Sequence, residues 1–291
     1  MRVHLIDGTY ELFRHYFALP SRTAGDGVEV AAVRGVLGSV LSLLREGATH
    51  VGVATDHVIE SFRNELWPSY KTGEGIAPGL YGQFPILERG LAAMGVAVWA
   101  MVEYEADDAL AAGAVQAEAY AGQVVICTPD KDLAQCVIGT RVVQLDRRKG
   151  IVMDENGVVA KFGVLPCSIP DLLALAGDSA DGFPGLPGWG AKSAAAVLSK
   201  FGHIEDIPAD PAAWGVPVRG APVLSATLEG QRELAMLFKD LATLRTNVPI
   251  DASEEALRWR GPREDFGAFA EYLDAPELMR MAEQAAQSKT A

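Results

Sequence analysis

Acidic residues crowd one short stretch of the chain, EYEADDAL at residues 103–110. Glu105, Asp107 and Asp108 lie within four positions of one another there, and Glu103 lies just upstream. Like charges at this spacing repel one another, and burial adds to the cost unless each charge is paired or bound to metal. Hard cations such as Mg²⁺ prefer carboxylate oxygens as ligands. The stretch therefore indicates chemistry that uses a divalent metal ion.

Acids also follow other apolar stretches of the sequence. Asp7 ends VHLID and Asp56 ends HVGVATD, while TPDKDL and AGDSADG each hold a pair. Helix capping or a turn explains any one of these residues as well as a metal does, but explains the whole set poorly. Two hard cations roughly 4 Å apart can activate a water and stabilise the leaving oxygen of a phosphodiester. The candidate ligands are Asp7, Asp56, Glu105, Asp107, Asp108, Asp130, Asp132, Asp178 and Asp181.

Other metal and ligand chemistries have weaker support in the sequence. The five histidines are scattered and show no spacing typical of zinc ligands. The chain has no G-x-x-x-x-G-K-[ST] motif and no strand-linked G-x-G-x-x-G motif, which argues against a nucleotide-binding enzyme.

Four further residues are candidates for contact with a phosphate group. Arg63, Tyr70 and Lys71 follow the Asp56 strand, and Arg14 lies in an otherwise apolar helical pattern. Arginine offers phosphate a bidentate fork, lysine a point charge, and an aromatic ring can stack on a base. Taken alone, the stretch around Arg63 is better explained as a solvated loop with one buried aromatic, and Arg14 faces either solvent or the site.

The elements that must position these residues follow from the hydrophobic pattern. Over the first 165 residues, short β-rich stretches alternate with helical patterns. This predicts an α/β fold with a mostly parallel twisted sheet and helices on both faces. In such a sheet, ligands bind beyond the carboxyl ends of the strands, where the acids lie. Strands are expected at 3–7, 50–56, 96–101, 123–128 and 141–146, with 150–154 returning as a hairpin.

Helical patterns fill the rest of the chain, so we expect one domain over 1–165 and a helical domain over 166–291. The stretch GLPGWGAKSA at 185–194 resembles a helix–hairpin–helix. Such a turn points backbone N–H groups and a helix N-terminus at phosphate without reading base sequence, and Lys192 would add a charge. An ordinary glycine-rich connection is the alternative. The tail, 283–291, is expected to be frayed.

The composition is typical of a globular protein in a reducing compartment. Hydrophobic residues make up 49% and charged residues 22% of the chain. The three cysteines form no C-x-x-C pair, and there is no signal pattern and no apolar run of membrane-spanning length. The net charge of −13 argues against a nucleic-acid partner unless bound cations cancel part of it. We expect a cytoplasmic monomer with no membrane partner.

With these residues assembled, the chain resembles the bacterial 5′-3′ exonuclease and flap endonuclease family, which includes the N-terminal nuclease domain of DNA polymerase I. The matching blocks, in order over about residues 3–200, are LIDGTYELFR, ATDHVIESFRNELWPSYK, EYEADDAL, TPDKDL and AGDSADGFPGLPGWGAKSA. The resemblance implies a PIN-like nuclease domain, a helical arch at about 62–83, and a helical domain with a helix–hairpin–helix (H3TH). No polymerase sequence follows, so the chain looks like a free-standing member.

The resemblance also implies a role for each candidate residue. The first metal would be bound by Asp7, Asp56, Glu105 and Asp107, with Asp108 adjacent. The second would be bound by Asp130, Asp132, Asp178 and Asp181. The groups acting on phosphate would be Arg14, Arg63, Tyr70 and Lys71. A K⁺ ion would be held by backbone groups of the hairpin, at Leu186, Gly188 and Trp189.

The sequence departs from the family pattern at two places. The chain has Glu74, in TGEG, where the family commonly has an arginine, and this removes or moves a phosphate contact. It has Ala180-Asp181-Gly182 where the family has Ser-Asp-Asn, which keeps the acid but loses a polar neighbour. Neither departure changes a predicted metal ligand.

The expected activity is hydrolysis of DNA phosphodiesters by two-metal-ion catalysis with Mg²⁺ or Mn²⁺. By resemblance, the protein would act as a 5′-3′ exonuclease and 5′-flap endonuclease in replication and repair, on flaps, nicked or branched duplexes and single-stranded 5′ ends. Two alternatives stay open: a catalytically weak scaffold that binds branched DNA, and a PIN-type ribonuclease.

Overall fold

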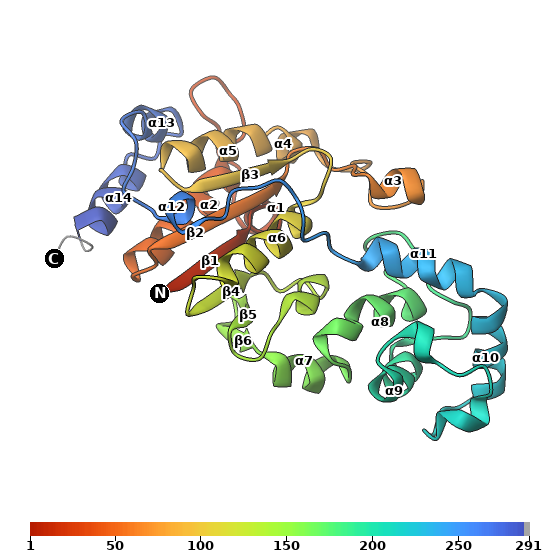
Figure 1. The fold of residues 1–291 in the computed structure, drawn as a ribbon. Coiled ribbons are helices and arrows are strands. Elements are labelled where there is room, and N and C mark those ends of the chain that lie inside the picture. The colour runs from red at the N-terminus through yellow and green to blue at the C-terminus, as the bar shows by residue number, and fades with distance from the viewer. Residues whose placement is uncertain (288–291) are drawn as a thin grey trace. The chain divides into compact units, whose positions relative to one another are not determined.

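The computed structural model describes residues 1–287, which form two compact units (Figure 1). Unit 1 combines Met1–Ile59, Gly73–Thr128 and the chain from Thr246 on. Unit 2 combines Glu60–Thr72 and Pro129–Arg245. Each unit is therefore built from segments that are not continuous in the sequence, whereas the sequence predicts two consecutive domains.

Unit 1 is built on four parallel strands in the order β3-β2-β1-β4. Their bounds are β1 Arg2–Asp7, β2 His50–Asp56, β3 Ala97–Met101 and β4 Gln123–Cys127. Every residue of β2 is buried, so helices cover both faces of the sheet at its centre. The predicted strands and the α/β fold class are confirmed.

The helices of unit 1 pack closely on this sheet. α6 packs against all four strands, while α1 and α5 pack against β2. Glycine allows the close approach at two places. A Cβ at Gly8 would lie 2.7 Å from the Ala54 oxygen, and one at Gly113 would lie 2.8 Å from the Trp99 ring. The helices are α1 Gly8–Ala18, α2 Ala31–Arg45, α4 Pro78–Tyr81, α5 Phe84–Ala93, α6 Ala106–Glu118, α12 Glu254–Leu257, α13 Phe266–Tyr272 and α14 Glu277–Gln287.

The C-terminal segment belongs to unit 1 and not to the helical part that precedes it. The Trp259 backbone N–H donates to Thr49 O (2.9 Å), its indole Nε1 donates to Met94 O (2.8 Å), and α14 packs on α2. This grouping differs from the expected helical domain over 166–291. The tail expectation is wrong for 283–287, which are helical; its other residues lie outside the described part of the chain.

Unit 2 is mostly helical, with one antiparallel hairpin formed by β5 and β6, as the sequence predicts. α8 packs against both α9 and α11. Its α-helices and strands are α3 Arg63–Leu66, β5 Val142–Asp146, β6 Ile151–Met153, α7 Glu155–Phe162, α8 Ile169–Ala176, α9 Ala191–Phe201, α10 Ala221–Gly230 and α11 Arg232–Ala242. Short 3-10 helices cover Asp132–Cys136, Pro166–Ser168, Ile204–Asp206 and Pro211–Trp214.

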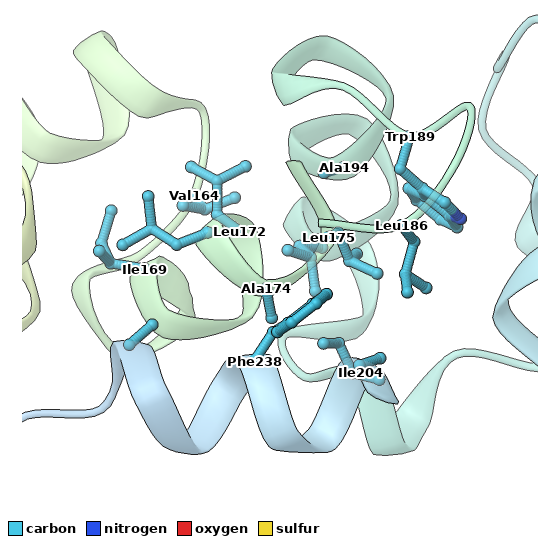
Figure 2. Packing of buried hydrophobic residues seen from close by; sticks show 14 of the residues in the cluster. Val164, Ile169, Leu172, Ala174, Leu175, Leu186, Trp189, Ala194, Ile204 and Phe238 are labelled. Carbon is cyan, nitrogen blue, oxygen red and sulfur yellow. The ribbon is translucent and has the colours of Figure 1, made fainter. Parts of the chain in front are cut away.

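An apolar core holds the helices of unit 2 together (Figure 2). Figure 2 shows Phe238 of α11 pointing from below toward Ala174 of α8. Leu175 and Leu186 lie in the same cluster and are almost fully buried. This packing fixes both helices that flank the predicted hairpin.

The segment predicted as a helical arch, 62–83, contains two helices of four residues each, α3 and α4. α3 belongs to unit 2 and α4 to unit 1, because the division falls at Thr72 and Gly73. Over residues 1–287, no single helix is both long and apolar enough to cross a membrane. Taken together, α7 and the helical stretch Pro166–Ala176 are long and apolar enough, but they are bent by 45° relative to each other.

Candidate metal centre and nucleic-acid interface

Two buried carboxylates of unit 1 lie at the carboxyl ends of neighbouring parallel strands. Asp7 ends β1 and Asp56 ends β2. Asp7 Oδ1 accepts from Tyr10 N (2.8 Å), Asp7 Oδ2 accepts from Thr128 Oγ1 (2.9 Å), and Asp56 Oδ1 accepts from Ala106 N (2.7 Å). Each carboxylate oxygen can accept more than one bond, so these contacts orient the groups without excluding a metal.

The acidic stretch that opens α6 is partly explained by helix capping. Glu105 is the N-cap residue, and Asp108 Oδ2 accepts from its backbone N–H (3.0 Å) in a reciprocal capping box. Asp107 is half-buried in the first turn, where the helix dipole favours negative charge. Asp108 is fully buried and thus has a structural role of its own. Its place beside the first metal stays a prediction.

Three acids of unit 2 come together from separate parts of the sequence. Carboxylate oxygens of Asp132, Asp178 and Asp181 all lie within 4.8 Å of one another, and no other three histidine, cysteine or acidic residues among 1–287 do so. Asp132 and Asp178 are only 7% and 3% exposed. Asp132 Oδ1 and Asp178 Oδ2 are buried oxygens, and the Lys131 ammonium is the group that lies 3.4 Å and 2.5 Å from them. Such a donor set fits a hard divalent cation.

The acids around this trio add to its negative charge, and nearby lysines offset only part of it. Burial raises the pKa of Asp132 well above its ordinary value, and the carboxylates of Asp130 and Asp181 raise it further. Burial also raises the pKa of Asp181, with a further contribution from Asp178. A bound cation would relieve both effects, because it favours the charged form of each group.

Asp130, the fourth predicted ligand of the second metal, lies beside the trio but not in it. Its side chain is exposed, and Oδ1 accepts from Asp132 N (3.0 Å). Its carbonyl accepts from Nε2 of Gln144 (2.5 Å), a buried residue of β5. Asp130 thus shapes the turn that presents Asp132.

The segment 60–72 is attached to the loop that carries Asp181. Lys71 N donates to Asp181 O (3.0 Å), and Tyr70 OH donates to Asp181 Oδ2 (3.3 Å). Trp67 Nε1 donates to Gly182 O (3.1 Å). Tyr70 is only 3% exposed, so in this structure it supports a carboxylate and has no face free to stack on a base.

Arg63, the predicted phosphate contact, is 1% exposed. Its guanidinium donates to the carbonyls of Leu241 (2.8 Å) and Thr243 (3.1 Å) at the end of α11 and lies over the Phe62 ring. A cation at a helix C-terminus is stabilised by the helix dipole. These contacts favour a structural role, and contact with phosphate would require the side chain to leave them.

Arg14 lies on α1 and is 26% exposed. Its Nη2 lies 2.6 Å from Oε2 of buried Glu11 and 2.8 Å from His15 Nε2, while its buried Nε has no hydrogen-bond partner. The structure therefore leaves donor capacity on Arg14. Its predicted contact with phosphate stays a prediction.

The helix–hairpin–helix is formed by α8, a glycine-rich loop and α9. Leu186 N donates to Leu175 O (3.0 Å) and Trp189 Nε1 donates to Leu224 O (3.1 Å), so one backbone bond and one buried indole fix the loop. Gly188 is exposed with a φ of +82°. Exposed Lys192 lies in the first turn of α9, on the wall of a shallow pocket of about 580 Å³ that also includes Pro217 to Arg219.

Several supporting residues escaped the sequence reasoning. Thr128 orients Asp7, Gln144 holds the Asp130 carbonyl, and Asn64 Nδ2 donates to the carbonyls of Tyr70 and Lys71. A polar residue inside an apolar strand, as in VVQLD, is the one signal that could have indicated Gln144. Thr128 has no local signature, because its partner Asp7 lies 121 positions away.

Comparison with known proteins finds matches over most of the chain. The family described as 5′-3′ exonuclease, N-terminal resolvase-like domain, matches residues 2–163, and that described as 5′-3′ exonuclease, C-terminal SAM fold, matches residues 164–265. A 5′-3′ exonuclease of Aquifex aeolicus is 32% identical and covers 89% of this chain and 87% of its own length. DNA polymerase I of Pseudomonas aeruginosa is 35% identical over 98% of this chain, which spans about a third of that relative's length.

Solved structures share the fold at lower sequence identity. The T5 5′-exonuclease with bound zinc has a TM-score of 0.68 at 18% identity, with 97% of this chain and 100% of that chain covered. The catalytic core of Rad2 in complex with DNA substrate has a TM-score of 0.63 at 17% identity, with 98% and 90% covered.

Proposed function

The chain belongs to the 5′-3′ exonuclease family, and from that premise we propose that it is a structure-specific 5′-3′ exonuclease and 5′-flap endonuclease that hydrolyses DNA phosphodiesters. The observation that carries the proposal is the trio Asp132, Asp178 and Asp181. Its three carboxylates converge within 4.8 Å, and two of them are buried, which is costly unless cations bind there.

Mg²⁺ or Mn²⁺ is the proposed cofactor, since all candidate ligands are carboxylates. The trio would hold one ion, and Asp7, Asp56, Glu105 and Asp107 of unit 1 would hold another. When bound, such ions activate water and neutralise charge that develops on a phosphodiester. The chain's own residues orient these carboxylates: Tyr10 and Thr128 fix Asp7, and Tyr70 fixes Asp181.

DNA is the proposed partner, held through its backbone. Exposed Gly188 and the N-terminal turn of α9 offer backbone N–H groups to phosphate, and the Lys192 ammonium adds charge. These contacts do not depend on base sequence, which suits an enzyme that recognises strand structure. The backbone of Leu186 to Trp189 is the proposed site for K⁺.

Cleavage of a 5′-labelled flap duplex in Mg²⁺ tests the proposal. We expect Asp132→Asn to lower the cleavage rate by at least about 100-fold while DNA binding in Ca²⁺ is kept, because the loss of one ligand charge weakens metal-assisted hydrolysis. Asp154→Asn is the matched control. Asp154 caps α7 by accepting from Gly157 N, outside the predicted ligand set, and asparagine keeps that cap.

The same assay separates the alternatives. Binding of the flap without cleavage by the parent protein would indicate a scaffold. Faster cleavage of single-stranded RNA than of the DNA flap would indicate a ribonuclease. Equal rates for the parent and Asp132→Asn would contradict the role of the trio.

A further inference from the structure

Lys131 places its ammonium group against the buried carboxylate oxygens of Asp132 and Asp178. Its Nζ lies 2.5 Å from Asp178 Oδ2 and 3.4 Å from Asp132 Oδ1. The Lys131 side chain is 35% exposed, while the two carboxylate side chains are 9% exposed or less. The lysine therefore reaches a buried acidic cluster from a position that is open to solvent.

The Lys131 ammonium lies within ion-pairing distance of both buried carboxylates. A cation of this kind reduces the repulsion among Asp132, Asp178 and Asp181 when no metal is present. The cluster would otherwise contain buried like charges, which strongly oppose folding.

We propose that Lys131 is an internal counter-ion of the second acid cluster, which a divalent cation must displace in order to bind. This inference rests on the proposed function, since it takes the trio to be a metal site. Lysine suits the role because its compact ammonium sits on a flexible four-carbon stem. The exposed part of the side chain gives the displaced ammonium a route into solvent. The lysine thus stabilises the metal-free protein and lowers the affinity of the cluster for metal.

Titration of the chelator-treated, full-length protein with Mn²⁺ by calorimetry tests this inference. Removal of the charge in Lys131→Met should tighten Mn²⁺ binding at one site roughly tenfold, because the ion no longer competes with an ammonium group. In EDTA, the same variant should melt about 3–6 °C below the parent, because the carboxylates lose their counter-ion. Saturating Mn²⁺ should remove most of this difference.

Lys149→Met is the matched control. Lys149 pairs with Asp146 at 3.3 Å in the same unit, on the surface and away from the trio. It should leave both Mn²⁺ affinity and melting temperature unchanged. If Lys131→Met does not fold in EDTA, Lys131→Gln replaces it, since glutamine keeps a polar group beside the carboxylates.

Asp132→Asn, titrated in parallel, separates failure of this inference from failure of the proposed function. If Asp132→Asn binds one ion fewer, but Lys131→Met binds Mn²⁺ as the parent does or more weakly, the counter-ion role is overturned and the metal site stands. If Asp132→Asn binds as many ions as the parent, the trio is not a metal site and both proposals fall.

Discussion

At the scale of the residue, Gly182 determines how closely the loop that carries Asp181 approaches Ser69. Its φ is +81°, and a Cβ there would overlap the carbonyl oxygen of Ser69. Any side chain at this position would meet the same oxygen, and most residues would also be strained at this φ. Glycine at this position thus lets residues 69–71 lie against the loop that carries Asp181.

We expect Gly182→Ala to lower the free energy of unfolding by about 2 kcal/mol more than Gly202→Ala does. Gly202 is the control because its φ is +78° and no atom lies within 4 Å of a Cβ placed there, so alanine pays only the backbone strain. Urea denaturation of the two variants measures the difference. Equal losses would show that the approach of Ser69 does not constrain residue 182.

At the scale of the element, a buried ion pair joins α8 to α11. Asp171 of α8 is fully buried, and its carboxylate lies 2.8 Å from Lys239 Nζ of α11 and 3.0 Å from His203 Nδ1. Ile204 N also donates to it (2.9 Å). Lys239 reaches Glu205 as well, at 2.8 Å. The pair thus fixes the helix that leads into the hairpin against the helix whose C-terminus binds Arg63.

Lys239→Met should lower the free energy of unfolding by about 3 kcal/mol at pH 7, because it leaves a buried carboxylate without its cation. Lys149→Met, which breaks a surface pair, should cost less than about 1 kcal/mol. Urea denaturation of both variants and the parent provides the measurement. A loss for Lys239→Met no larger than that of the control would mean that the ion pair does not stabilise unit 2.

The loss of unfolding free energy in Lys239→Met should depend on pH through the ionisation of Lys239 and Glu205. Burial would lower the pKa of Lys239, but hydrogen bonds to Asp171 and Glu205 raise it above 10.5, so its contribution is present below pH 10.5 and is lost as pH rises through the folded pKa. Burial would raise the pKa of Glu205, but Lys239 lowers it below 4.5. The contribution of Glu205 is therefore present above pH 4.5 and lost as pH falls through the folded pKa. The difference in unfolding free energy between the parent and Lys239→Met should stay constant from about pH 5 to 10 and become smaller outside that range.

At the scale of the whole molecule, unit 1 contains segments from both ends of the sequence. Residues from the far end of the sequence pack against α6 of unit 1. Tyr120 OH donates to Ala252 O (2.6 Å), and Gln116 exchanges hydrogen bonds with Ile250 and Ala252. Trp259 is 4% exposed and packs in the same unit. Unit 1 therefore combines residues from both ends of the sequence.

A chain that ends after Arg245 should fail to fold unit 1, because the apolar faces of α2 and β2 lose the segment that covers them. We expect the truncated protein to aggregate or to melt far below the parent when followed by circular dichroism. A chain that ends after Gln287 serves as the control and should melt like the parent. A truncation at Arg245 with an unchanged melting temperature would contradict this division of the molecule.

The sequence alone determined the alternation of strands and helices, the placement of Asp7 and Asp56 at strand ends, and the family. These features depend on neighbours a few positions apart, which hydrophobic periodicity and short motifs record. Only the tertiary structure decided that Arg63 is buried on Leu241 O, that Lys131 pairs with Asp178, and that the chain after Thr246 completes unit 1. The partners in these contacts lie tens to hundreds of positions apart, so they are set by packing and by the need to satisfy buried charges and hydrogen bonds, which leave no local pattern.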